Sequence, residues 1–128
     1  MQPVPSATLT TGVGLDGDKH ASAASKRQVL IADREALDAL DLRPGTIKEN
    51  LTVEGLDAMS LTPGTRIRLG ATAMLEITSV CEPCFRMDEI RQGLKTDLEG
   101  RRGMNSVVIA GGPIRVGDLI TTVEPRAV

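Results

Sequence analysis

Residues 66–80 read RIRLGATAMLEITSV and contain two β-strand patterns separated by a glycine. Residues 66–69 alternate polar and apolar side chains, which is typical of a strand with one buried face. Gly70 interrupts this alternation, and residues 73–80 form a second, more apolar strand pattern. This stretch predicts a fold built from short strands that end at glycine turns.

The rest of the chain extends this pattern. Further strands are expected at residues 28–32, 50–53, 106–110 and 119–123, with turns at 63–64, 111–113 and 117–118. Short strands between glycine-rich turns favour a β-barrel or sandwich. The sequence therefore predicts a mainly β fold, a small β-barrel with one or two short helices.

The predicted helices are few. Asp33 can cap a helix that carries Leu37 and Leu40 on its apolar side and ends near Pro44-Gly45. A second short helix is expected at residues 88–94. Residues 95–103 are charged, so we expect a mobile loop there.

Length and composition exclude several classes of protein. The 128 residues suit a single domain spanning 1–128, with residues 1–11 extended. The chain has one Phe, no Tyr, no Trp and a net charge of −2, which argues against binding to nucleic acid. It shows no signal peptide and no run approaching the roughly 20 apolar residues that span a membrane. We expect a cytoplasmic protein without membrane contact.

The run VCEPCFR at residues 80–86 carries the clearest chemistry. Two cysteines in a CxxC spacing can hold half of a zinc site, form a redox disulfide or pack as small apolar residues. Only His20 adds another nitrogen or sulfur ligand, so we expect no zinc site. A thioredoxin-type motif belongs at the start of a helix in a βαβ unit, whereas this one follows a predicted strand.

The two cysteines are not equivalent. Core packing is the favoured interpretation for Cys81, at the end of the predicted strand. Cys84 follows Pro83 and precedes Arg86, and a guanidinium beside a thiol favours the thiolate, which is the nucleophilic and metal-binding form. Cys84 is therefore the predicted reactive residue.

Other polar residues each allow two interpretations. Lys19 and His20, in the turn GLDGDKH at residues 14–20, can face an anionic ligand or belong to a solvated loop. Arg27 and Arg102 precede predicted strands, where a guanidinium can bind phosphate or remain a surface charge. Asn50 can contact a heterocycle edge or stabilise a turn.

Six phrases, taken in order, resemble one family, the MOSC domain, named after the C-terminal domain of molybdenum-cofactor sulfurases. The phrases are GLDGDKH (14–20), RQVLIADREAL (27–37), PGTIKENLTVEGLD (44–57), LTPGTRIRLGATAMLEIT (61–78), EPCFR (82–86) and GGPIRVGDLI (111–120). The resemblance covers residues 12–124. It implies a mainly β structure around a barrel and a protein that binds molybdenum cofactor or handles sulfur.

The resemblance also implies roles for particular residues. The family cysteine corresponds to Cys84, which would accept sulfur as a persulfide or coordinate molybdenum. The family's glycine turn corresponds to residues 17–20, and its Glu-Asn pair to Glu49 and Asn50. With the other basic residues, the predicted cofactor-binding set is Lys19, His20, Arg27, Asn50, Arg86 and Arg102.

Three functions follow from these expectations. The first is a domain that binds the pterin cofactor or carries sulfur on Cys84, supplied by a pyridoxal-phosphate cysteine desulfurase. The second is a catalytic role in molybdenum-dependent reduction of N-hydroxylated compounds, which requires an electron-donor protein. The third is an interaction domain without cofactor.

Overall fold

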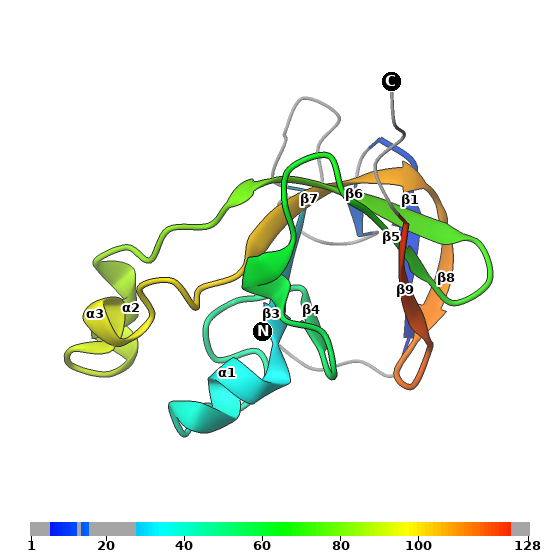
Figure 1. The fold of residues 1–128 in the computed structure, drawn as a ribbon. Coiled ribbons are helices and arrows are strands. Elements are labelled where there is room, and N and C mark those ends of the chain that lie inside the picture. The colour runs from blue at the N-terminus through cyan, green and yellow to red at the C-terminus, as the bar shows by residue number, and fades with distance from the viewer. Residues whose placement is uncertain (1–5, 13, 16–27, 124–128) are drawn as a thin grey trace. The chain divides into compact units, whose positions relative to one another are not determined.

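The computed structural model describes residues 6–12, 14–15 and 28–123 (Figure 1). These residues belong to two compact units that alternate along the chain. The first unit contains Leu30–Leu61 and Val80–Met104, and the second contains Thr62–Ser79 with the described parts of Val4–Val29 and Asn105–Val128. The expectation of a single domain stays a prediction.

Short strands dominate the described chain, and the mainly β prediction is confirmed. The hydrogen-bonding orders of the strands are β2-β1-β8 and β4-β3-β7-β6-β5-β9. The strands are β1 (Ser6–Thr10), β2 (Gly14–Leu15), β3 (Val29–Asp33), β4 (Leu51–Val53), β5 (Arg66–Leu69), β6 (Ala73–Val80), β7 (Met104–Ala110), β8 (Gly112–Arg115) and β9 (Ile120–Val123). The helices are α1 (Arg34–Ala39), α2 (Arg86–Ile90), α3 (Leu94–Asp97) and the 3-10 turn η1 (Ala58–Ser60). None of these helices has the length and apolar character needed to cross a membrane.

The second unit is built on the antiparallel pair β5–β6, whose predicted limits are confirmed. Gly70, with a φ of 63°, lies in the turn between the two strands. Ile67 and Leu75 are partners in the register and are fully buried. Arg66 and Glu76, also partners, form an ion pair with 3.2 Å between Nε and Oε1. The alternation of polar and apolar residues therefore separates a core face from a solvent face.

The predicted turn at residues 111–113 is partly wrong. Gly112 and Pro113 belong to β8, which pairs with β1 through Leu9↔Gly112 and Thr8↔Pro113. β8 is the last strand of its sheet and has a neighbouring strand, β1, on one side only. Proline, which lacks an N–H, is tolerated in such an edge strand.

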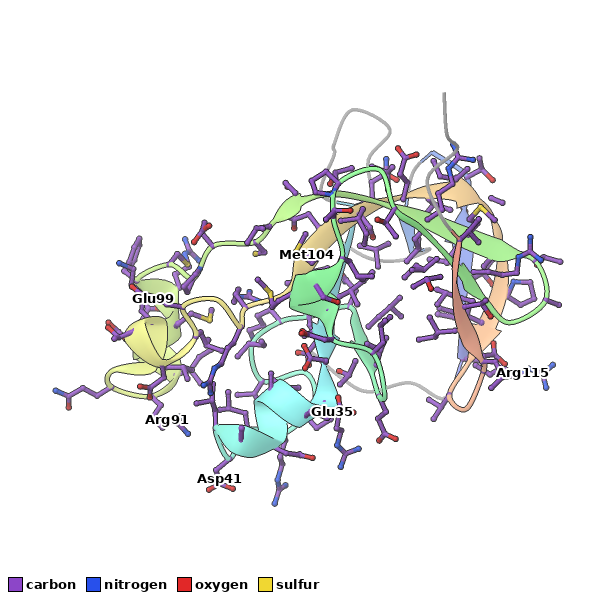
Figure 2. All side chains as sticks on the ribbon, viewed as in Figure 1. Glu35, Asp41, Arg91, Glu99, Met104 and Arg115 are labelled. Atoms are coloured by element: carbon purple, nitrogen blue, oxygen red, sulfur yellow. The ribbon has the colours of Figure 1, made fainter. Side chains whose placement is uncertain are left out.

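The first unit begins with β3 and α1. Asp33 caps the helix as predicted, with its Oδ2 accepting a hydrogen bond from the Ala36 N–H at 3.2 Å. The helix ends at Ala39, earlier than the expected end near Pro44-Gly45. Arg91 donates from Nη1 to the Leu40 carbonyl at 2.7 Å, which links the end of α2 to the end of α1 (Figure 2).

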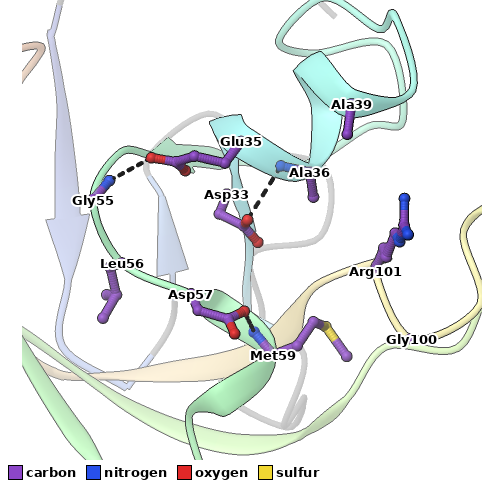
Figure 3. Close-up of a pocket in the computed structure, with 10 residues that line it drawn as sticks. All are labelled: Asp33, Glu35, Ala36, Ala39, Gly55, Leu56, Asp57, Met59, Gly100 and Arg101. Carbon is purple, nitrogen blue, oxygen red and sulfur yellow. Dashed lines mark hydrogen bonds between the residues drawn. The ribbon is translucent and has the colours of Figure 1, made fainter.

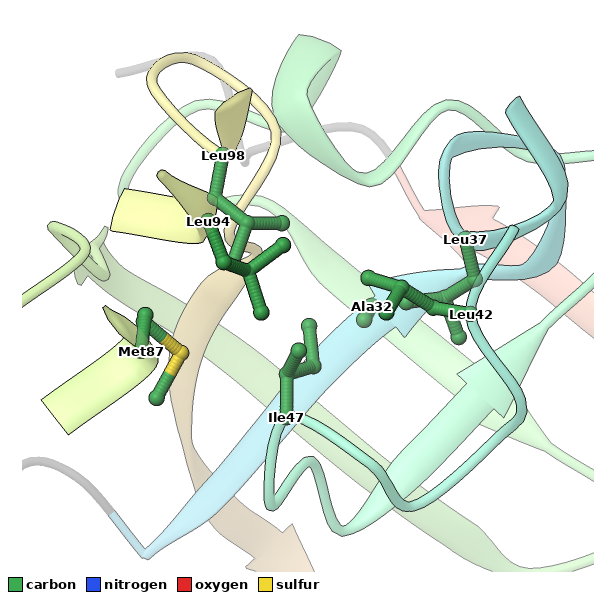
Figure 4. Close-up of a cluster of buried hydrophobic side chains, with 7 residues drawn as sticks. All are labelled: Ala32, Leu37, Leu42, Ile47, Met87, Leu94 and Leu98. Atoms are coloured by element: carbon green, nitrogen blue, oxygen red, sulfur yellow. The ribbon is translucent and has the colours of Figure 1, made fainter. Parts of the chain in front are cut away.

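The segment after the cysteines contains two helices, α2 and α3, where one was expected. Leu94 and Leu98 are fully buried and lie four residues apart, so they occupy one face of a helical turn. They join an apolar cluster with α1 and the loop that follows it, formed by Ala32, Leu37, Leu42, Ile47, Met87, Leu94 and Leu98 (Figure 4). The loop expected at residues 95–103 instead contains part of α3, and Leu98, its one apolar side chain, is buried.

Leu98→Ala should lower the free energy of unfolding by about 2–5 kcal/mol, because it leaves a cavity in this cluster. Urea denaturation measures the change, and Glu99→Ala, at an exposed neighbouring position, is the control. Equal effects of the two substitutions would show that α3 does not pack as described.

Candidate functional site

Cys84 lies in the segment Cys81–Cys84, which connects β6 to α2. Its side chain is exposed and its thiol is free. The Cys84 carbonyl accepts a hydrogen bond from the Met87 N–H at 3.0 Å, so the residue leads directly into the first turn of α2. The structure therefore presents the predicted reactive thiol to solvent on a short loop.

Cys81 holds the other end of this loop. Its N–H donates to the Gly103 carbonyl at 3.0 Å, and its thiol lies 3.9 Å from the Glu82 carbonyl. The side chain is half-buried rather than fully buried. The expectation that Cys81 is a packed core residue is thus wrong, because the strand pattern has ended before its side chain reaches the core.

Gly103 is the residue against which the loop is anchored. It has a φ of 128°, and a Cβ at this position would collide with the Ile31 carbonyl oxygen. Only glycine combines this backbone conformation with such a close approach. Gly103 therefore joins β3 to the cysteine loop, and it places Arg102 beside both.

Arg102 is the one buried cation among the described residues of the first unit. It is 7% exposed, and its buried Nη1 atom has no hydrogen-bond partner. No hydrogen bond or ion pair joins the Arg102 guanidinium to any side chain in the described part of the chain. Burial of an unpaired charge is costly, so this guanidinium is suited to an anion that the described residues do not supply.

Asn50 lies on the other side of β3. Its Oδ1 accepts from the Leu30 N–H at 2.8 Å, and its own N–H donates to the Leu30 carbonyl at 2.9 Å. Asn50 thus extends the parallel β3–β4 pairing by one residue beyond Leu51. Its Nδ2 donates to no residue in ranges 6–12, 14–15 and 28–123, and this atom is available to a ligand.

Glu49 has a structural role. This buried carboxylate accepts from the Gly45 N–H at 2.9 Å and from the Thr52 hydroxyl at 2.8 Å. It therefore fixes the loop that delivers Asn50 to the edge of β3. In the Glu-Asn pair expected from the family resemblance, Glu49 therefore stabilises the loop, and Asn50 hydrogen-bonds β3.

These contacts bring several predicted residues near the middle of β3. Gly103 approaches Ile31 from one side, and Asn50 bonds Leu30 from the other. Neighbouring strands lie about 5 Å apart, so the backbones on the two sides of β3 are about 10 Å from each other. Asn50, Arg102 and the cysteine loop therefore belong to one neighbourhood within the first unit.

The remaining predicted residues are not gathered there. Arg86 is the first residue of α2 and is exposed, without a hydrogen bond or ion pair to the described residues. Lys19, His20 and Arg27 lie outside the described residues.

A separate cavity of about 580 Å³ opens near the end of β3 in the same unit (Figure 3). It is lined by Asp33, Glu35, Ala36, Ala39, Gly55, Leu56, Asp57, Met59, Gly100 and Arg101. Its carboxylates already accept backbone hydrogen bonds, Asp33 from Ala36, Glu35 from Gly55 and Asp57 from Met59. No sequence pattern indicates this cavity, because its acidic residues come from separate segments and accept hydrogen bonds from nearby backbone N–H groups.

Metal ligands do not cluster in the described chain. No group of three or more His, Cys, Asp or Glu side chains within it could hold a metal ion.

Comparison with known proteins identifies the family. The MOSC domain family model matches residues 17–121. The chain belongs to the MOSC domain family. MOSC domains are associated with molybdenum-cofactor binding, and the predicted resemblance is confirmed.

Solved structures share the fold of this MOSC domain. The YuaD protein from Bacillus subtilis is 24% identical, with a TM-score of 0.82 over 91% of this chain and 84% of that one. YiiM from Escherichia coli is 23% identical, with a TM-score of 0.74 over 94% of this chain and 64% of that one. YiiM from Geobacillus stearothermophilus is 20% identical, with a TM-score of 0.70 over 77% and 55%. No curated protein matches the chain.

Gly103→Ala should destabilise the protein by more than about 1 kcal/mol, since the new methyl group meets the Ile31 carbonyl in a backbone conformation unfavourable to alanine. Gly100→Ala is the matched control, because Gly100 also has a positive φ of 72° but no atom within 4 Å of an added Cβ. Urea denaturation compares the two. A loss no greater for Gly103→Ala would contradict the close approach.

Glu35 should titrate below its ordinary pKa of 4.5, because the Gly55 N–H donates to its carboxylate at 2.7 Å. A lowered pKa in the folded state means that ionised Glu35 stabilises the protein above pH 4.5, and that this contribution disappears as pH falls through the lowered pKa. Carboxyl NMR titration measures the pKa. The stability curves of wild type and Glu35→Gln should differ near neutral pH and converge in acid, and parallel curves would contradict the assignment.

Proposed function

We propose that this MOSC domain binds molybdenum cofactor or carries sulfur, with Cys84 as the molybdenum ligand or persulfide carrier. The observation that carries the proposal is the buried guanidinium of Arg102, whose Nη1 atom has no hydrogen-bond partner among the described residues. Its neighbour Gly103 anchors the loop that exposes the Cys84 thiol. The Cys81 N–H donates to the Gly103 carbonyl, so the backbone segment that carries Arg102 is hydrogen-bonded to the segment that carries Cys84.

The charge on Arg102 fits the phosphate of the pterin cofactor. A guanidinium presents several N–H donors in one plane and can bind two phosphate oxygens at once. Burial strengthens such an interaction because less water screens it. The partnerless Nη1 atom supplies a donor that no described residue uses.

The absence of a metal-ligand cluster among the described residues also fits this cofactor. A metal that arrives already chelated by an organic cofactor needs only one further ligand from the protein, whereas a bare ion needs three or four. The exposed sulfur of Cys84 would supply that ligand. When bound, the cofactor would provide oxygen-atom chemistry, and the protein would provide binding and orientation.

Further contacts complete the proposed site. Asn50 would donate from Nδ2 to the pterin edge, and Arg86 would add positive charge beside Cys84. Lys19, His20 and Arg27 complete the predicted cofactor set from the sequence. We expect a cytoplasmic protein, and the proposed partners are a pyridoxal-phosphate cysteine desulfurase for sulfur transfer or an electron-donor protein for reduction.

Sulfur carriage needs only the Cys84 thiolate and a donor. The thiolate would attack the outer sulfur of a persulfide on the desulfurase, forming a new S–S bond. The desulfurase cysteine leaves as a thiolate, so the atoms and electrons balance. Reduction of N-hydroxylated compounds is the second candidate, and it also depends on Cys84.

Expression in a molybdenum-replete host should yield molybdenum or a Cys84 persulfide in Cys81→Ser, and neither in Cys84→Ser. Metal analysis and intact mass spectrometry measure both. Arg102→Met should lose the molybdenum while keeping the free energy of unfolding of the cofactor-free protein, because it removes an unpaired buried charge.

Two results would overturn the proposal. Cys81→Ser protein that carries neither molybdenum nor sulfur, even after incubation with a cysteine desulfurase and its substrate, would favour the cofactor-free interaction domain. Strong destabilisation of the cofactor-free protein by Arg102→Met would show that Arg102 has a structural partner rather than a ligand.

A further inference from the structure

We propose that Cys81 is a resolving thiol, which attacks a persulfide on Cys84, releases sulfide and closes a Cys81–Cys84 disulfide. This inference rests on the sulfur-carrier form of the proposed function and adds an activity to it. It concerns the cysteine that has no counterpart in the family pattern quoted above.

The environment of Cys81 leaves its thiol free to react. The side chain is half-buried, and its only hydrogen bond to a described residue is the weak contact with the Glu82 carbonyl at 3.9 Å. It belongs to no metal-binding group among the described residues. A cysteine that neither packs fully nor binds a metal can act as a second thiol.

The backbone holds the two cysteines differently. Cys81 is anchored by its N–H to Gly103 at 3.0 Å, and Cys84 is anchored by its carbonyl to Met87 at 3.0 Å. Neither Glu82 nor Pro83, which lie between them, forms a backbone–backbone hydrogen bond with the described residues. The connection can therefore bend without breaking the anchor at either end.

The length of the connection allows the bridge. Three fully extended residue steps span at most about 11 Å, and a disulfide requires Cα atoms about 4.4–6.8 Å apart. A bend at Glu82 and Pro83 would therefore be enough to bring the Cα atoms of Cys81 and Cys84 within this range. Since Cys84 is exposed, the bulk of a persulfide meets no packed core at that end.

The reaction balances without an added oxidant. The Cys81 thiolate attacks the inner sulfur of Cys84–S–SH, so the Sγ–Sγ bond forms and the bond to the outer sulfur breaks. The outer sulfur leaves with the electron pair as hydrosulfide and takes a proton from water. Two cysteine sulfurs are oxidised to a disulfide while the carried sulfur is reduced to sulfide.

As a consequence, the protein would carry sulfur on Cys84 only for a limited time. If an acceptor is present, the persulfide sulfur is passed on from Cys84. Without an acceptor, Cys81 discharges it as sulfide and leaves a disulfide that a dithiol reductant can reopen.

The experiment loads Cys84 chemically with sodium tetrasulfide and removes the excess reagent. Wild type, Cys81→Ser and Cys81→Ala are then followed by mass spectrometry with peptide mapping and by a sulfide assay. Wild type should lose the added sulfur, about 32 Da, at least about tenfold faster than either variant, and should end about 2 Da below the reduced mass. Dithiothreitol should restore the reduced mass.

Several outcomes would overturn the inference. These are equal sulfide release from wild type and both variants, no Cys81–Cys84 disulfide in wild type, transfer of the persulfide to Cys81, or no persulfide on Cys84 in any protein. Urea midpoints of the two variants control for folding. Chemical loading bypasses the desulfurase, so failure of enzymatic sulfur transfer to Cys84 is a separate result that concerns the proposed function alone.

Discussion

The close approach of Gly103 to the Ile31 carbonyl is the constraint on which the candidate site depends. It requires a residue without a Cβ, and it positions the Gly103 carbonyl to accept the Cys81 N–H. The same approach places Arg102 next to β3 and the cysteine loop. A larger residue at position 103 would move β3, Arg102 and the cysteine loop apart.

The buried charges of Glu49 and Arg102 differ in their hydrogen-bond partners. Glu49 receives two hydrogen bonds from neutral donors and stabilises its own loop, whereas Arg102 receives no partner from the described residues. A satisfied charge contributes to the fold, and an unsatisfied one costs stability until a ligand binds. The cavity lined by Asp33, Glu35 and Asp57 resembles the Glu49 case, since its carboxylates are already used as caps.

The two cysteines differ by exposure and anchoring rather than by sequence context alone. Cys84 presents an exposed thiol at the start of α2, and Cys81 keeps a half-buried thiol at the end of β6. This arrangement suits one sulfur that exchanges with partners and another that reacts only within the loop. The CxxC spacing by itself is compatible with zinc binding, redox chemistry and packing.

The sequence by itself determined the strands β5 and β6, the cap at Asp33 and the family, because alternation, capping and motif order are local signals. Only the tertiary structure decided that Leu98 is buried, that Pro113 lies in a strand, and that Arg102 is buried without a partner among the described residues. It also showed that Asn50 completes the β3–β4 pairing. These features depend on contacts between residues distant along the chain, such as Gly103 with Ile31, and no local pattern encodes the partner of such a contact.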